Sequence, residues 1–148
     1  MFTLLFNGAL RYLIALLLFL TAHAVVAQSH DNDRLRAENN PRKRAELALN
    51  LASAALDDAS RFYKEGEIQK GDGGLEDMTG DLKECLSSLR EAHKGSNYQK
   101  AELKVSSLQR RLHDLIGNIG IGDRGWAEQT ERTVDSIHDQ ILSGAMKK

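Results

Sequence analysis

The sequence predicts an all-α protein, an antiparallel bundle of about four amphipathic helices arranged as helical hairpins after an N-terminal signal segment. Three observations predict this fold. Apolar residues recur at alternating spacings of three and four along four stretches, which is the period of a helix with one buried face. Glycines separate these stretches, and no stretch alternates with the period of two that marks a strand. Connections this short favour antiparallel neighbours.

The chain begins with an apolar segment that predicts export. Arg11 precedes an apolar run from Tyr12 to Ala22, and small residues suited to cleavage follow that run. We therefore predict a signal peptide over residues 1–27, cleaved near Ala27 with a second possible cut after Ala24, and a periplasmic or secreted protein. The alternative is an uncleaved helix that anchors the chain in the membrane. The run is, however, shorter than the roughly 20 apolar residues that a spanning helix needs.

Polar residues separate this segment from the first amphipathic stretch. Residues 28–40 are predicted to be a flexible lead-in, and residues 41–148 the bundle domain. Asn40 and Pro41 predict a helix start, because asparagine caps the first backbone N–H groups and the fixed φ of proline suits the first turn. Gly66 predicts the end of this helix. The apolar stripe of this first helix contains many small residues, which would let a partner helix approach closely. The stripe is Ala45, Ala48, Leu49, Ala52, Leu56, Ala59 and Tyr63.

The second stripe runs from Ile68 to Ala92 and crosses three glycines within residues 71–74. Either the helix begins at once and tolerates these glycines, or they form a loop. Each glycine costs a helix about 1 kcal/mol relative to alanine. We therefore expect a frayed or late start, with regular helix from Leu75 onwards. Gly95 is predicted to end this helix.

The third and fourth stripes flank a glycine-rich stretch from Gly117 to Gly125. Ser96 and Gln99 form a capping box at the start of the third helix. Residues 120–125 match G-x-G-x-x-G, but the dinucleotide fingerprint needs a strand before it, so we interpret them as an inter-helix loop. The third stripe is Tyr98, Ala101, Val105, Leu108, Leu112, Leu115 and Ile119, and the fourth is Ala127, Thr130, Val134, Ile137 and Ile141.

The composition excludes several classes of function. The 148 residues carry 20 basic and 21 acidic side chains, a balance that argues against a nucleic-acid binder. A single cysteine excludes an internal disulfide framework and a multi-cysteine zinc site, and Cys85 is expected to fill the core. No serine lies in a G-x-S-x-G or S-x-x-K motif. We therefore expect neither an enzyme nor a cofactor.

Two features suggest contact with a partner. Arg42, Lys43 and Arg44 open the first helix, where each cation opposes the helix dipole by roughly 0.3–1 kcal/mol. This local cost suggests a use, either an acidic protein partner or the anionic surface of a membrane. Trp126, beside the glycine-rich loop, is either a core anchor or an exposed contact. The leading hypothesis is an exported, non-enzymatic bundle that binds a protein partner of unknown identity or has a structural role in the cell envelope.

The alternative hypothesis is a periplasmic bundle that binds a small ligand or a metal. His113, His138 and carboxylates would then act together across helices. No histidine pair at i, i+4 and no Glu-x-x-His motif is present among the histidines, so no metal ligand is predicted from spacing. The sequence does not decide whether the chain forms a homo-oligomer, because one of the four stripes could face a second subunit.

Overall fold

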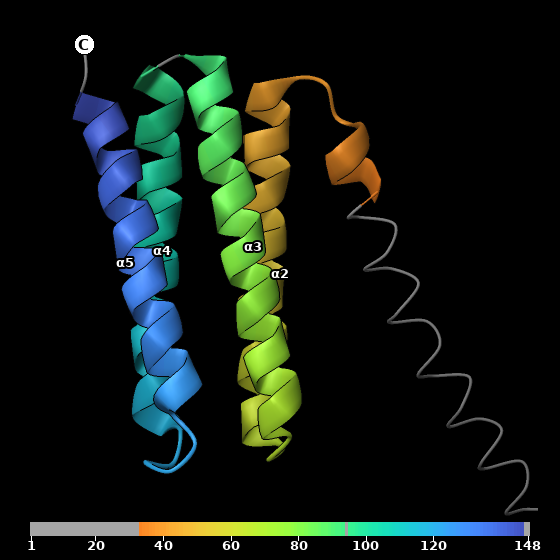
Figure 1. The fold of residues 1–148 in the computed structure, drawn as a ribbon, viewed down its shortest axis with the longest axis vertical. Helices are drawn as coiled ribbons and strands as arrows, with labels where there is room; N and C mark the ends of the chain where they lie inside the picture. Colours follow the sequence, from red (N-terminus) through yellow and green to blue (C-terminus); the bar gives the residue numbers. More distant parts are fainter. Residues whose placement is uncertain (1–32, 94, 147–148) are drawn as a thin grey trace, which may run out of the picture. The chain divides into compact units, whose positions relative to one another are not determined.

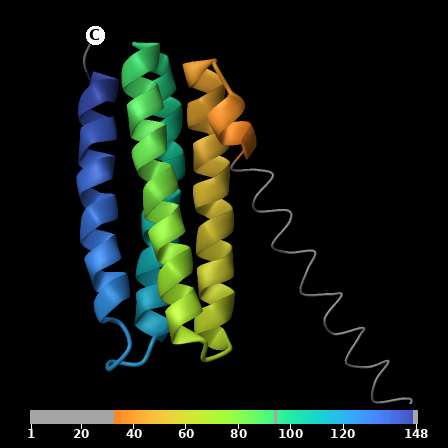
Figure 2. The ribbon, with the colours of Figure 1, turned by 45° about the vertical axis from the view of Figure 1, so that its right-hand side comes forward.

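The computed structural model describes residues 33–93 and 95–146, and residues 41–146 contain four long helices. Consecutive helices run in opposite directions, as Figures 1 and 2 show. No strand occurs in the described ranges. The predicted all-α antiparallel bundle is therefore confirmed. The helices are α2 (Pro41–Lys64), α3 (Ile68–Ala92), α4 (Gly95–Asn118) and α5 (Gly125–Met146).

The chain divides between Ala37 and Glu38, and the bundle belongs to the second part. Within the first part, residues 33–37 are helical, so the stretch predicted as a lead-in contains one helical segment. The predicted signal peptide, residues 1–27, lies outside the described residues. Among the helices that the structure describes, none combines the length and the apolar character needed to cross a membrane.

The start of α2 has the predicted cap. The side-chain oxygen of Asn40 accepts hydrogen bonds from the backbone N–H groups of Arg42 at 3.0 Å and Lys43 at 3.4 Å. Pro41 follows the cap and needs no such partner because it has no N–H group. Two of the donors that a helix start leaves unpaired are thus satisfied locally.

The end of α2 is also formed by hydrogen bonds between residues close in sequence. Gly66 has a positive φ of 75°, which costs glycine little because it has no Cβ. Its N–H donates to the carbonyl oxygen of Tyr63 at 3.1 Å, and the N–H of Glu67 donates to that of Phe62 at 2.9 Å. These two bonds form a Schellman motif, so the prediction that Gly66 ends the helix is confirmed.

The predicted end of α3 is wrong by two residues. His93, and not Gly95, takes the left-handed conformation at the helix end, with φ of 50°. Gly95 already belongs to α4, and Ser96, expected to cap that helix, lies inside it. The turn is therefore shorter than the glycine suggested.

The predicted late start of α3 is also wrong, because the helix is continuous from Ile68. Two of its glycines, Gly71 and Gly74, lie against α2. A Cβ on Gly74 would lie 3.0 Å from the Cβ of Ala59, and one on Gly71 would lie 2.9 Å from the ring of Tyr63. Glycine thus lets the two helices approach closely, and the resulting packing outweighs its low helix propensity.

The four predicted stripes form the core. Cys85 is fully buried in it, and burial raises the pKa of its thiol to about 12. Its predicted role as a core residue is confirmed, and the thiol is held in its unreactive protonated form. The largest fully buried apolar side chains come from all four helices. They are Leu56, Leu75, Met78, Leu82, Leu89, Leu112, Ile141, Val105 and Val134.

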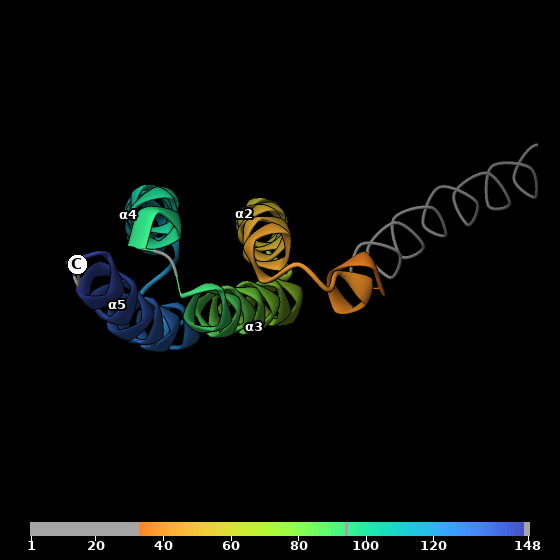
Figure 3. The ribbon, with the colours of Figure 1, turned by 90° about the horizontal axis from the view of Figure 1, so that it is seen from above.

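The helices pair as two hairpins, α2 with α3 and α4 with α5. Seen from above in Figure 3, α3 lies beside α5, while α2 and α4 lie on the same side of that pair.

We call the line where α2 and α4 face each other the α2–α4 seam. Long polar side chains bridge it. Lys104 donates to the side-chain oxygen of Asn50 at 3.2 Å. Arg111 donates to the hydroxyl of Ser53 at 2.9 Å and pairs with Asp57.

Candidate functional site: a basic cavity on the α2–α4 seam

A cavity of about 320 Å³ lies on the α2–α4 seam at the end where α2 begins. The first turns of α2 and α4 form its two sides, and Leu89 reaches it from α3. Its size is at the lower end of the range for small-molecule sites. The lining residues are Asn40, Arg42, Lys43, Ala45, Glu46, Leu49, Leu89, Asn97, Lys100, Ala101 and Lys104.

Four exposed cations surround this cavity, two from each helix. We call Arg42, Lys43, Lys100 and Lys104 the basic rim. Glu46 is the single carboxylate among the lining residues. Within the described part of the chain, no hydrogen bond or ion pair engages the side chains of Arg42, Lys43 or Lys100. The cavity is therefore an electropositive hollow, and an anionic group would meet several cations there at once.

Arg44, predicted to act with its two neighbours, points to α3 instead. Its Nε donates to the hydroxyl of Ser88 at 2.8 Å and lies 3.1 Å from a carboxylate oxygen of Glu84. Its guanidinium also pairs with Glu91 and donates to the carbonyl oxygen of Glu38 at 3.3 Å. Ser88 is fully buried, so this bond satisfies a hydroxyl that water cannot reach. Arg44 fastens α2 to α3 and does not line the cavity.

Trp126 lies far from the basic rim. It stands in the first turn of α5, and Figure 1 shows that α2 and α5 begin at opposite ends of the bundle. Its side chain is 42% exposed, and Ile121 in the preceding loop is 86% exposed. Trp126 is therefore not a buried core anchor, and the two candidate contacts of the sequence do not converge.

The two histidines of the alternative hypothesis lie apart along the α4–α5 hairpin. His113 Nδ1 is 2.9 Å from a carboxylate oxygen of Glu131, and this bond raises the pKa of His113. His138 Nε2 is 3.0 Å from the hydroxyl of Ser106 and 3.3 Å from Glu102. Hydrogen bonds from Ser106 and His138 lower the pKa of Glu102. In the described residues, no group of three or more His, Cys, Asp or Glu side chains could hold a metal ion.

The contacts among Ser106, His138 and Glu102 do not form a catalytic relay. In such a relay, the carboxylate holds one imidazole nitrogen while the other faces the hydroxyl. Here the carboxylate and the hydroxyl share Nε2, and the hydroxyl also donates to the carboxylate at 2.9 Å. The arrangement links α4 to α5 but gives the serine no oriented base.

Sequence reasoning missed half of the basic rim and one further residue. Lys100 and Lys104 are spaced by four, so they share a helix face, but that spacing is common on solvated helices. No motif or spacing in the sequence distinguished Asn97. Its side-chain Nδ2 lies buried at the cavity with no hydrogen-bond partner in the described structure. These residues join Arg42 and Lys43 only through the register of α4 against α2.

Comparisons with known proteins leave the function to be argued from this site. No protein-family model, no curated protein and no solved structure matched the chain. Helical bundles carry many unrelated functions, so the fold does not identify an activity. The function is therefore inferred from the chemistry of the basic rim and its cavity.

Proposed function

We propose that the chain is an exported, non-enzymatic helical bundle that binds an acidic protein partner through the basic rim. One observation carries the proposal. Four cations from two helices converge on one hollow, and a single carboxylate, Glu46, stands against them. Such a surface attracts an acidic segment from a distance and fixes its position on contact.

Helix energetics supports a role outside folding for part of the rim. Arg42 and Lys43 stand in the first turn of α2, which contains no acidic residue. Each opposes the helix dipole by about 0.3–1 kcal/mol. Their side chains form no ion pair within the described residues that would offset this cost. Within the described residues these two charges thus form no ion pair in the fold, and an acidic partner would supply one.

The shape of the site favours a protein segment over a flat membrane surface. The cations surround a hollow instead of projecting from a convex face. A carboxylate on a flexible side chain can enter a hollow and meet several cations there. A planar array of lipid head groups would reach the outer ends of the rim only.

The export part of the proposal rests on the pattern of residues 1–27. Arg11, the apolar run and the small residues before Gln28 are the three parts of a cleaved signal. Expression of the full chain in a bacterium should yield a product in the periplasm or medium that begins at Gln28, measured by intact mass. A full-length product held in the membrane fraction would contradict cleavage.

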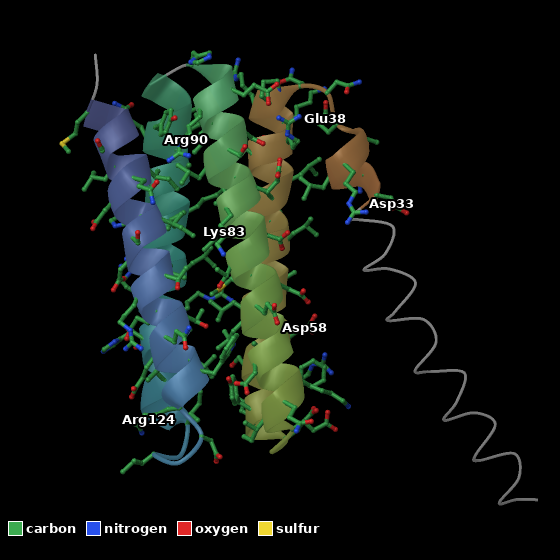
Figure 4. All side chains as sticks on the ribbon, viewed as in Figure 1. Asp33, Glu38, Asp58, Lys83, Arg90 and Arg124 are labelled. Carbon is green, nitrogen blue, oxygen red and sulfur yellow. The ribbon has the colours of Figure 1, made fainter. Side chains whose placement is uncertain are left out.

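Binding can be tested with a fluorescent glutamate-rich peptide as the acidic probe. The rim variant replaces Arg42, Lys43 and Lys100 by glutamine. The control variant replaces Lys83, Arg110 and Arg132, three exposed cations outside the cavity, and so has the same net charge. Figure 4 shows Lys83 near the middle of α3.

We expect the rim variant to weaken peptide binding by about tenfold or more, measured by fluorescence anisotropy near physiological salt. The control should change it less than about twofold. Equal losses in both variants would mean that net charge alone attracts the peptide, and the proposal would then be wrong.

A further inference from the structure

A second cavity, of about 590 Å³, lies between α3 and α5 at the end of the bundle where both helices end. We call it the α3–α5 cavity. It shares no lining residue with the cavity on the α2–α4 seam, and its volume lies within the range of small-molecule sites. Exposed polar residues of α5 form one side, so a ligand would reach them without any opening of the fold. They are Ser136, Asp139, Gln140 and Ser143.

Arg90 brings a cation to this cavity from α3, and Figure 4 shows it near the end of that helix. Its Nη2 donates to the side-chain oxygen of Gln140 on α5 at 2.7 Å. This bond uses one of the five N–H donors of the guanidinium and holds the group in place. No other hydrogen bond or ion pair engages Arg90 within the described residues. A held guanidinium with free donors matches the two oxygens of a carboxylate.

Asp139 brings the opposite charge to the same cavity from α5. Arg90 and Asp139 are the only Arg, Lys, Asp or Glu residues in its lining, and in the described structure no ion pair joins them. An anion alone would be repelled by Asp139, and a cation alone would be repelled by Arg90. A ligand that carries both charges would give each of the two residues a partner.

An aromatic ring closes one end of the cavity. Tyr98, from the first turn of α4, lies against Gly144 of α5 so closely that a Cβ on Gly144 would collide with the ring. The missing side chain therefore makes room for the ring, which is itself only partly buried. Its uncovered surface can pack against an apolar or aromatic group of a ligand.

We infer that the α3–α5 cavity binds a free amino acid, with its carboxylate on Arg90, its ammonium group at Asp139 and an apolar or aromatic side chain along Tyr98. Inorganic phosphate would use only the guanidinium, and a neutral apolar molecule would use only the ring. Because Arg90 and Asp139 are exposed to water, we expect a dissociation constant of about 0.1–1 mM. The site is independent of the basic rim and of the partner proposed for it.

The test uses three probes with the same side chain and different charges. Phenylalanine carries both charges, N-acetylphenylalanine the carboxylate alone and phenylalaninamide the ammonium group alone. Binding to the purified protein is measured by NMR titration, which follows the ring signals of Tyr98 and the side-chain amide signals of Gln140. We expect phenylalanine to bind at least about fivefold more tightly than either analogue and to shift both sets of signals.

Two variants assign the charges. Arg90→Gln should weaken phenylalanine and N-acetylphenylalanine by about threefold to tenfold without weakening phenylalaninamide. Asp139→Asn should weaken phenylalanine and phenylalaninamide by a similar factor without weakening N-acetylphenylalanine.

Each variant has a matched control outside the cavity. Lys83→Gln removes an exposed cation of α3, and Asp135→Asn removes an exposed carboxylate of α5. Each control should change the affinity for phenylalanine less than about twofold. The rim variant with glutamine at positions 42, 43 and 100 should bind phenylalanine as the unchanged protein does, so the two proposed sites can fail separately.

Several results would overturn the inference. Equal affinity for phenylalanine and N-acetylphenylalanine would reduce the cavity to an anion site at Arg90. Equal affinity for all three probes would leave only packing against Tyr98. Losses in the controls as large as those in Arg90→Gln and Asp139→Asn would assign the effect to net charge. No shift of the Tyr98 or Gln140 signals at about 10 mM phenylalanine would exclude the site.

Discussion

Two faces of helix α2 pack differently, one closely against α3 through small residues and one against α4 through long polar side chains. Toward α3 it presents small residues, and Gly74 lies so close to Ala59 that a Cβ there would contact it at 3.0 Å. Toward α4 it presents polar bridges such as Lys104–Asn50, with the basic cavity at one end. Small residues let backbones approach and leave no space. Long polar side chains hold helices further apart, so a site can form between them.

The largest expected effect comes from filling the close α2–α3 contact. Gly74→Leu forces extra carbons against Ala59 and should destabilise the bundle by about 2–3 kcal/mol. Gly73→Leu is the matched control, because a Cβ there meets nothing within 4 Å. It should be neutral or stabilise by up to about 1 kcal/mol through better helix propensity. Urea unfolding followed by circular dichroism measures both, and similar effects at the two glycines would refute close packing at this contact.

A second prediction separates neighbouring cations of α2. Arg44→Gln removes the bond to buried Ser88 and the pairing with Glu84 and should cost about 1–3 kcal/mol. Arg42→Gln removes a cation that opposes the helix dipole and should stabilise by about 0.3–1 kcal/mol at low salt. Opposite shifts in the melting temperature would confirm that folding uses Arg44 alone. A loss of stability in Arg42→Gln would show that the rim also serves folding.

The polar bridges of the α2–α4 seam should contribute little. Arg111→Gln breaks the bonds to Ser53 and Asp57, whose side chains are partly or largely exposed. Exposed pairs contribute about 0–1 kcal/mol, so we expect a loss below about 1 kcal/mol. Chemical denaturation measures it. A loss as large as that of Gly74→Leu would mean that the seam is as rigid as the α2–α3 contact.

A further prediction is a pH dependence of stability that comes from α3. Burial, and then the charge of Asp77, raise the pKa of Asp81 to about 6. The folded state therefore binds a proton more readily than the unfolded state, and this contribution to stability declines as pH rises through about 6. Asp81→Asn should raise the melting temperature by a few degrees near pH 7 and change it little near pH 4. An equal shift at both pH values would contradict the raised pKa.

The sequence predicted the elements with local causes. The four stripes are buried except at Ile68, Ala92 and Tyr98, which are only partly buried. Asn40 and Gly66 begin and end α2 through contacts within a few residues. It was wrong where packing overrode local preference. The glycines near the start of α3 lowered its expected helicity, but contact with α2 keeps that helix intact. His93 ended α3 although a glycine was available two residues later.

The candidate site was only half visible in the sequence. The charge cluster of Arg42 and Lys43 could be read directly, because adjacent residues need no fold to be neighbours. The sequence could not show which residue of that cluster serves which role. Adjacent helical residues point in different directions, and their partners come from other helices. Arg44 meets Ser88 on α3, whereas its neighbours join Lys100 on α4.

The sequence by itself determined the helices, their buried faces and most of their ends, because helix period and capping act over three or four residues. The tertiary structure decided which charges are used inside the fold and which remain available. It also created the cavity, since Ala45 and Ala101 belong to helices whose rotation and register are set by the packing of the whole bundle. Convergence of residues from α2, α3 and α4 is a property of that packing.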